Sequence, residues 1–333
     1  MTDKTHIESV GQSAKTLIAC GDDFALMKQA VDELYRVFSG ITGVRVDQLG
    51  ADKDIMLPSG KAISTAAAAH CLLEMKRTAV FLRGIDKAIR QQLSANPQKT
   101  LHLLYAGTGP YGTLIIPLLL LYKPQELIVD LLDINSVSLV ALQKVIDTLA
   151  LNDYIGEVYC TDATRFIIPR HYDIAISETM LACLKSEPQV AIMQNLIPQL
   201  AEDCIFIPEE ISIDACLTNP KMEMERLLYY ENESPPFERR LLGNVFVISK
   251  HKLDDIKSRK TFSIPDDAIV FPVLNLFTTV KVFDNEILTD NDSSITLPKR
   301  FYDFRRQSAN EVVFWYVQGE KPRIESGIVQ PTF

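Results

Sequence analysis

The chain has 333 residues, of which 47% are hydrophobic and 23% charged, as expected for a globular protein of one large or two medium domains. Its net charge of −9 argues against a nucleic-acid partner, which would require a basic face, but permits a cationic substrate. The longest apolar stretch, residues 114–122, is too short to cross a bilayer and no signal peptide is visible, so we expect a cytoplasmic protein without a membrane partner.

Residues 1–95 are predicted to be mostly helical. Residues 24–38 place apolar side chains at three- to four-residue spacing, which is typical of an amphipathic helix. A proline and a glycine predict a loop at 56–64. The alanine-rich stretch at 65–93 predicts a long helix, in which Gly84 could introduce a kink.

Strands and helices are predicted to alternate over residues 96–209. This order is typical of a doubly wound, Rossmann-like parallel sheet with helices on both faces, so the fold class is α/β. The expected strands are 101–106, 126–134, 156–163, 172–177 and 204–210, and the expected helices are 113–122, 136–151 and 189–201.

Residues 210–333 are predicted to form an antiparallel β domain, because β-branched and aromatic residues alternate there between turn-forming segments. The expected strands are 211–217, 244–249, 268–277, 278–283 and 311–317.

A charged and aromatic segment, residues 219–242, interrupts this β pattern. Its residues Leu227, Leu228, Tyr229 and Tyr230 form an apolar stretch outside any predicted sheet. We interpret the segment as an arm that makes a homodimer contact. The alternative, that these side chains belong to the core of an ordinary helix, stays open.

Polar and glycine residues follow three successive predicted strands. Gly107-Thr108-Gly109 comes after the first strand and Asp133 ends the second, where a carboxylate can accept hydrogen bonds from a ribose diol. Asp162, at the end of the third, could accept a hydrogen bond from an adenine amino group, although each acid could also serve only as a helix cap or turn former. Together they indicate an adenosine-bearing ligand.

The chemistry of the rest of that ligand follows from what the sequence lacks. The turn at 107–112 has the GxGxxG spacing but carries Pro110 within it, which argues against a pyrophosphate cradle, and no GK[ST] phosphate loop follows a strand. Both observations favour S-adenosylmethionine over NAD or ATP. The six cysteines form no CxxC pair and have no zinc-type histidine spacing, so we expect no metal.

Glu178 and Glu187 are nine positions apart and follow the fourth predicted strand. Two converging carboxylates suit a planar cation with several donors, and the arginine guanidinium is the best biological match. A chain with 43 acidic residues also places such pairs on its solvated surface, and that alternative stays open.

The motifs over residues 74–212 resemble those of the protein arginine methyltransferase family of S-adenosylmethionine-dependent enzymes. The helix EMKRTAVFLRGIDKAI, the glycine motif AGTGPYG, the acidic strand DLLDI and the segment TDATRF resemble its cofactor-binding elements. The resemblance implies that S-adenosylmethionine binds, with S-adenosylhomocysteine as the product. It assigns the cofactor to Arg77, Gly107, Thr108, Gly109, Asp133, Asp162 and Ala163.

The segment ISETMLACLKSE resembles the family's double-glutamate loop. The resemblance implies that Glu178 and Glu187 are catalytic and bind the substrate guanidinium, with Met180 beside them in the substrate site. It also implies arm-mediated dimers, which favours the homodimer interpretation of residues 219–242.

The departures from the family concern mainly the substrate side. Thr179 replaces a tryptophan, the family's Tyr-Phe-x-x-Tyr helix and Thr-His-Trp loop have no counterpart, and Leu103 and Tyr105 replace an acid and a glycine in the first strand. This pattern resembles bacterial methyltransferases of free L-arginine in small-molecule biosynthesis. We therefore expect residues 1–95 to form a lid over a small substrate. Lys61 is a candidate to bind the substrate carboxylate, and the alternative that it is an ordinary solvated lysine stays open.

Three alternatives stay open. The substrate could be a protein arginine, or another amine or hydroxyl on a small molecule. The chain could also be a cofactor-binding scaffold without activity, for which Leu103 and Tyr105 are the supporting observation.

Overall fold

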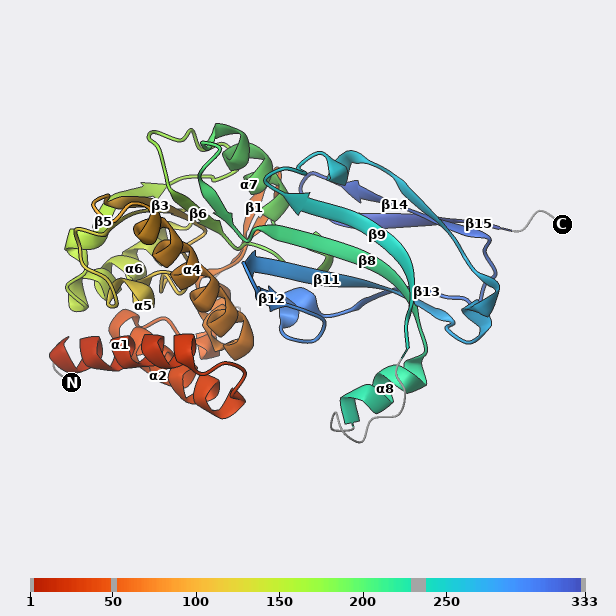
Figure 1. Ribbon diagram of the computed structural model, residues 1–333, viewed down its shortest axis with the longest axis horizontal. Coiled ribbons are helices and arrows are strands. Elements are labelled where there is room, and N and C mark those ends of the chain that lie inside the picture. The colour runs from red at the N-terminus through yellow and green to blue at the C-terminus, as the bar shows by residue number, and fades with distance from the viewer. Residues whose placement is uncertain (1–2, 49–52, 229–237, 331–333) are drawn as a thin grey trace.

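The computed structural model describes residues 3–48, 53–228 and 238–330. Figure 1 shows the N-terminal helices beside a parallel sheet, and long antiparallel strands that extend from it toward the C-terminus. The predicted α/β class, with a helical N-terminal region and a C-terminal antiparallel β region, is confirmed. Over the described ranges, no helix is long and apolar enough to cross a membrane.

The N-terminal region is helical, but the single helix predicted over residues 65–93 is wrong. The chain breaks at Cys71–Leu73, a short 3-10 turn, and Glu74 has a non-helical backbone (φ −75°, ψ 80°). Gly84 instead lies inside an unbroken helix. The helices here are α1 Asp3–Ala19, α2 Phe24–Thr42, α3 Thr65–His70 and α4 Met75–Ala95.

The loop predicted over residues 56–64 is a short antiparallel hairpin of β1 (Ile55–Leu57) and β2 (Gly60–Ala62). Pro58 and Ser59 form its two-residue connection. The hairpin is held from outside as well, because the Lys61 N–H donates to the Ser186 carbonyl at 2.8 Å. Ser186 lies in a loop far along the chain, so the sequence of residues 56–64 alone does not reveal this hydrogen bond.

The parallel sheet has the strand order β5-β4-β3-β6-β7. The chain therefore fills one side of the sheet outward from β3 and then crosses to the other side through β6. Such a reversal places a crevice beyond the carboxyl ends of β3 and β6, where ligands bind in open α/β sheets. The strands are β3 Leu101–Ala106, β4 Leu127–Asp133, β5 Ile155–Cys160, β6 Ile174–Ser177 and β7 Ile205–Ile207.

The helices that connect these strands are shorter than predicted. The helix expected over residues 113–122 is reduced to α5 (Ile116–Leu119), where Pro117 lacks an N–H and Leu118 N closes a tighter turn onto Ile115 O at 2.9 Å. The others are α6 Ser136–Thr148 and α7 Gln189–Leu196.

The C-terminal region consists of two antiparallel sheets, with orders β12-β11-β8-β9 and β10-β14-β15, and β13 pairs with β11. The segments 268–277 and 278–283, predicted as two strands, meet in the single strand β11. Helix α8 (Pro220–Leu228) projects from the connection between β8 and β9 (Figure 1). The strands are β8 Glu210–Thr218, β9 Arg240–Ser249, β10 Lys260–Ser263, β11 Val273–Phe283, β12 Glu286–Leu288, β13 Lys299–Asp303, β14 Glu311–Val317 and β15 Arg323–Val329.

Helix α4 joins the helical region to the antiparallel sheets. Glu286 on β12 accepts from Arg83 Nε at 2.7 Å and from Lys87 Nζ at 2.6 Å, both on α4. A Cβ at Gly84 would lie 2.6 Å from Val282 Cγ1 of β11, so the helix backbone lies directly on that strand. These contacts fix the orientation of the helix that carries Arg77.

Candidate active site

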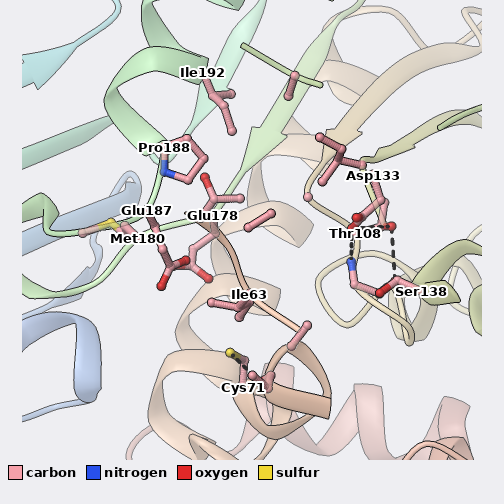
Figure 2. A pocket seen from close by; sticks show the side chains of 18 of the residues that line it. Ile63, Cys71, Thr108, Asp133, Ser138, Glu178, Met180, Glu187, Pro188 and Ile192 are labelled. Atoms are coloured by element: carbon pink, nitrogen blue, oxygen red, sulfur yellow. Dashed lines mark hydrogen bonds between the residues drawn. The ribbon is translucent and has the colours of Figure 1, made fainter. Parts of the chain in front are cut away.

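A cavity of about 390 Å³ lies at the carboxyl edge of the parallel sheet, a size typical of small-molecule sites. Figure 2 shows Asp133, Thr108 and Ser138 on one side of it and Glu178, Met180 and Glu187 on the other. Every residue that the sequence assigned to the cofactor or substrate lines this one cavity. They are Lys61, Arg77, Gly107, Thr108, Gly109, Asp133, Asp162, Ala163, Glu178, Met180 and Glu187.

The glycine turn after β3 brings backbone to the cavity wall. Gly107 and Gly109 have φ of +84° and +60°, a left-handed conformation that side chains disfavour. A Cβ at Gly107 would lie 2.5 Å from Thr179 Cγ2, beyond the end of β6. A side chain at Gly107 would therefore collide with the Thr179 methyl group as well as strain the backbone.

Asp133 ends β4 and is buried, with 8% of its surface exposed. Its carboxylate accepts from Gly109 N and Asn135 N, both at 2.8 Å, so it ties two strand-end turns together. Burial raises its pKa, and these hydrogen bonds oppose that rise. A carboxylate offers about four lone-pair sites, which leaves capacity for a ligand hydroxyl.

The turn after β5 forms another wall. Asp162 accepts from Thr164 N at 2.8 Å, which shapes the turn as a short Asx motif. The carbonyl of the buried Ala163 accepts from Asn195 Nδ2 at 3.0 Å. The turn is therefore fixed to helix α7, which follows the glutamates.

Arg77 lies in the first turns of α4 with its guanidinium buried inside the cavity wall. It donates to Glu74 Oε2 at 3.2 Å and directly contacts Glu178 Oε2. The residue expected to meet the cofactor and a residue expected to hold the substrate are therefore ion-paired with each other. The two halves of the site are coupled through this contact.

Glu178 and Glu187 lie side by side at one end of the cavity (Figure 2) and expose only 9% and 7% of their surface. Glu178 Oε1 is buried and has no hydrogen-bond partner among the described residues. Burial raises the pKa of Glu187 to about 7, although the nearby Arg77 and Lys61 charges lower it. A cationic ligand would satisfy both carboxylates.

The connection from Glu178 to Glu187, which we call the glutamate loop, has an unusual backbone. Cys183, Leu184 and Ser186 have φ of +58°, +53° and +71°. Non-glycine residues in this region cost about 1–3 kcal/mol each and persist only where neighbours hold them.

Those neighbours belong to distant strands and turns. Cys183 N donates to Thr278 Oγ1 at 2.9 Å, Ser186 N donates to Pro322 O at 2.7 Å, and Tyr316 OH donates to Leu184 O at 2.8 Å. The antiparallel sheets thus fix the loop conformation that aims both glutamates into the cavity.

Gln189 is a structural support that the sequence analysis missed. It is fully buried; its side-chain oxygen accepts from Thr179 N at 2.8 Å and its nitrogen donates to Ser177 O at 3.1 Å. It therefore closes the glutamate loop at its base. A glutamine at the start of a helix carries no distinctive sequence signal, so only the fold identifies this role.

Glu74 is a second missed residue of the cavity wall. Besides its ion pair with Arg77, its carboxylate accepts from Ser294 N at 3.3 Å, and Ser294 also lines the cavity. It therefore connects Arg77 to the C-terminal region. Its place three residues before Arg77, one helical turn away, was the available signal.

No protein-family model matches the chain, and no curated protein sequence matches it either. A solved structure with a similar fold is the Trypanosoma brucei PRMT1 enzyme–prozyme heterotetrameric complex with AdoHcy. The TM-score is 0.55 at 14% sequence identity, and the likeness covers 81% of this chain and 94% of that chain. The parallel sheet with its antiparallel β region therefore has the fold of that methyltransferase.

Proposed function

We propose that this chain is an S-adenosylmethionine-dependent N-methyltransferase that acts on the guanidino group of free L-arginine. The observation that carries the proposal is the single cavity that holds both the cofactor-type residues and the buried glutamate pair. The similar fold of a complex that contains AdoHcy supports the choice of cofactor. PRMT1 is named as a protein arginine methyltransferase, which supports a guanidino substrate.

The cavity residues fit this cofactor chemically. Asp133 has free acceptor capacity for ribose hydroxyls, Asp162 lies at the next strand end for an adenine amino group, and the Arg77 guanidinium can bind a carboxylate. The cofactor supplies an electrophilic methyl group on a positively charged sulfur. The glycine turn leaves room for backbone to approach it.

The glutamate pair would hold the substrate. A guanidinium is a poor nucleophile because its charge is delocalised over three nitrogens. Two carboxylates that each face a nitrogen draw the charge toward themselves and leave the third nitrogen with more lone-pair character. The same contacts orient that nitrogen, and orientation can lower a barrier by several kcal/mol.

Glu187 has a further use in this scheme. Burial raises its pKa to about 7 in the ligand-free chain, and a bound guanidinium would keep it charged. The charged carboxylate can then accept the proton that the methylated nitrogen releases.

Free arginine is favoured over a protein substrate by the position of the hairpin β1–β2. Lys61 of this hairpin lines the cavity and bonds to the glutamate loop, so the hairpin occupies space beside the substrate end. The helices and the hairpin of residues 1–95 would together form a lid over a small substrate.

The proposal is tested by incubating the purified chain with methyl-labelled S-adenosylmethionine and three acceptors: L-arginine, an arginine peptide and a histone-like protein. Mass spectrometry should find label on L-arginine, as Nω-methyl-L-arginine. Label only on the peptide or protein would make the chain a protein arginine methyltransferase. Label on none of them would overturn the proposed function.

A cofactor-binding scaffold without transfer activity is a second candidate. The contact between Arg77 and Glu178 favours it, since this contact engages one of the two carboxylates that the transfer requires. Calorimetry that detects S-adenosylhomocysteine binding, together with no label on any of the three acceptors, would support the scaffold.

We also propose that the chain forms a homodimer through helix α8. Its side chains Met224, Leu227 and Leu228 are exposed, with 58%, 66% and 70% of their surface accessible. Tyr229 and Tyr230, which the sequence assigned to the same contact, lie outside the described residues.

A further inference from the structure

The hairpin β1–β2 is docked against the backbone of the glutamate loop. The Lys61 N–H donates to Ser186 O at 2.8 Å. A Cβ at Gly60, whose φ is +137°, would lie 3.0 Å from backbone atoms of Ser186, Glu187 and Pro188. The start of β2 is therefore held at a fixed place beside Glu187.

An ion pair lies on this hairpin. Lys61 Nζ donates to Asp54 Oδ2 at 2.7 Å, and about one third of each side chain is exposed. Asp54 Oδ1 also accepts from Ser64 N at 2.9 Å. Burial alone would raise the pKa of Asp54, but the Lys61 ammonium and the Ser64 N–H hold it below its usual value, so the carboxylate is charged at neutral pH.

Both members of the pair retain hydrogen-bonding capacity. An ammonium has three donors and a carboxylate about four acceptor sites. The hydrogen bonds described above use one donor of Lys61 and two acceptor sites of Asp54. Lys61 lines the cavity, and Asp54 lies beside the Lys61 ammonium with about one third of its side chain exposed.

The ion pair is close enough to the glutamate pair to act on it. The Lys61 charge lowers the pKa of Glu187, and the Asp54 charge raises it. In L-arginine, five bonds separate the guanidino carbon from Cα, an extended reach of about 6 Å. A guanidinium held at Glu187 can therefore place the α-carbon of the same molecule beside the hairpin, which contacts the Glu187 backbone.

We propose that Lys61 binds the α-carboxylate and Asp54 the α-ammonium of a free L-arginine whose guanidinium lies at Glu178 and Glu187. This inference rests on the proposed function and adds the residues that recognise the amino-acid end. A zwitterion presents one charge to each member of an ion pair. A peptide-bound arginine presents neutral amides at the same place and would leave both charges without a ligand.

The test compares L-arginine with two analogues that each lack one charge. Agmatine lacks the α-carboxylate, and 5-guanidinopentanoate lacks the α-ammonium. The wild-type chain should use L-arginine about 10- to 100-fold better than either analogue, in line with the loss of one charged hydrogen bond.

Lys61→Met should lower kcat/KM for L-arginine by about 10- to 100-fold more than it lowers that for agmatine, because any effect through Glu187 is common to both substrates. Asp54→Asn should show the same pattern with 5-guanidinopentanoate in place of agmatine. Lys53→Met is the matched control, because Lys53 is an exposed lysine just before the hairpin, and it should leave all three substrates unchanged.

A binding measurement separates this inference from the proposed function. Calorimetry with saturating S-adenosylhomocysteine gives the affinity for L-arginine and agmatine without any turnover. If L-arginine binds more tightly than agmatine and loses this advantage in Lys61→Met, but no methyl group is transferred, the proposed function is wrong and the inference stands. Methyl transfer to L-arginine with equal losses for L-arginine and agmatine in Lys61→Met would overturn the inference alone.

Discussion

At the scale of single residues, the charges around Glu187 determine how the cavity can bind a cation. Burial raises its pKa to about 7, so Glu187 can change its protonation state near neutral pH. Glu178, beside it, is already paired with Arg77. A guanidinium would deprotonate Glu187 and occupy the unpartnered oxygen of Glu178, so binding and charge are linked in this site.

The glutamate pair is the residue-level feature to test first. Glu178→Gln and Glu187→Gln should each reduce methyl transfer to L-arginine by about 100-fold or more, as expected for losing a preorganised charge partner. Initial rates with saturating cofactor measure this, with the exposed Glu202→Gln as the control. Glu187→Gln is the cleaner variant, because Glu178 also contacts Arg77. Full activity of Glu187→Gln would discard the two-carboxylate mechanism.

The raised pKa of Glu187 also predicts a pH-dependent effect on stability. Because the folded-state pKa lies above the usual value of 4.5, the native state binds a proton that the unfolded state releases between about pH 4.5 and 7. The free energy of unfolding therefore falls as the pH rises through this window. At pH 8 the charged, buried Glu187 lowers the free energy of unfolding by the full amount, about 3 kcal/mol.

Glu187→Gln should remove that cost. Urea unfolding of the ligand-free protein should show the variant more stable than wild type by up to about 3 kcal/mol at pH 8, with the difference shrinking toward pH 5. If Glu187→Gln and wild type had the same stability difference at pH 8 and at pH 5, burial would not raise the pKa of Glu187.

Asp133 is expected to bind the ribose of the cofactor. Wild-type protein should bind S-adenosylhomocysteine in the micromolar range, and Asp133→Ala should weaken binding by about 1–3 kcal/mol because the ribose loses a charged acceptor. Isothermal titration calorimetry measures both, with the exposed Asp153→Ala as the control. Tight NAD binding with no binding of S-adenosylhomocysteine would contradict this assignment.

At the scale of elements, contacts between distant segments override local sequence signals. The proline and glycine of residues 56–64 predicted a loop, yet Lys61 N pairs with Ser186 and the segment forms a hairpin. Glycine in a helix interior predicted a kink at Gly84, yet α4 continues through it. The absence of a side chain at Gly84 lets the helix backbone pack against Val282. Neither partner can be recognised from the local sequence.

The packing of α4 on β11 gives an element-level prediction. Alanine normally stabilises a helix interior by about 0.5–1 kcal/mol relative to glycine. At Gly84, however, the added Cβ would lie 2.6 Å from Val282 Cγ1, so Gly84→Ala should lower the free energy of unfolding by about 1–3 kcal/mol. Gly40→Ala on α2 is the matched control, since a Cβ there would meet no described atom within 4 Å apart from its chain neighbours and the adjacent backbone of its own helix, and it should stabilise slightly. Thermal unfolding of both variants checks the opposite signs.

At the scale of the whole molecule, the regular alternation of strands and helices made the parallel sheet and its cavity predictable. Strand ends meet at one edge of such a sheet, so Gly107, Asp133, Asp162 and Glu178 were expected to converge, and all four line the cavity. The antiparallel region was harder, since β10, β12, β13 and β15 were not predicted. β10 and β13 pair with strands that are not their neighbours in the chain, β14 and β11, and such pairing is not visible in composition. β12 has only three residues, and β15 (RIESGIV) includes charged and small residues that obscure a strand pattern.

The proposed homodimer is tested on the intact molecule. Static light scattering at micromolar concentration should give about twice the chain mass of 37.4 kDa. Leu227→Glu combined with Leu228→Glu on α8 should yield the monomer, because charges would replace apolar side chains that a partner covers. Ile167→Glu, at a residue 80% exposed in the turn after β5, is the matched control and should stay dimeric. A wild-type mass of 37.4 kDa would refute the dimer, whereas a dimer that survives the α8 variant would place the contact elsewhere on the molecule.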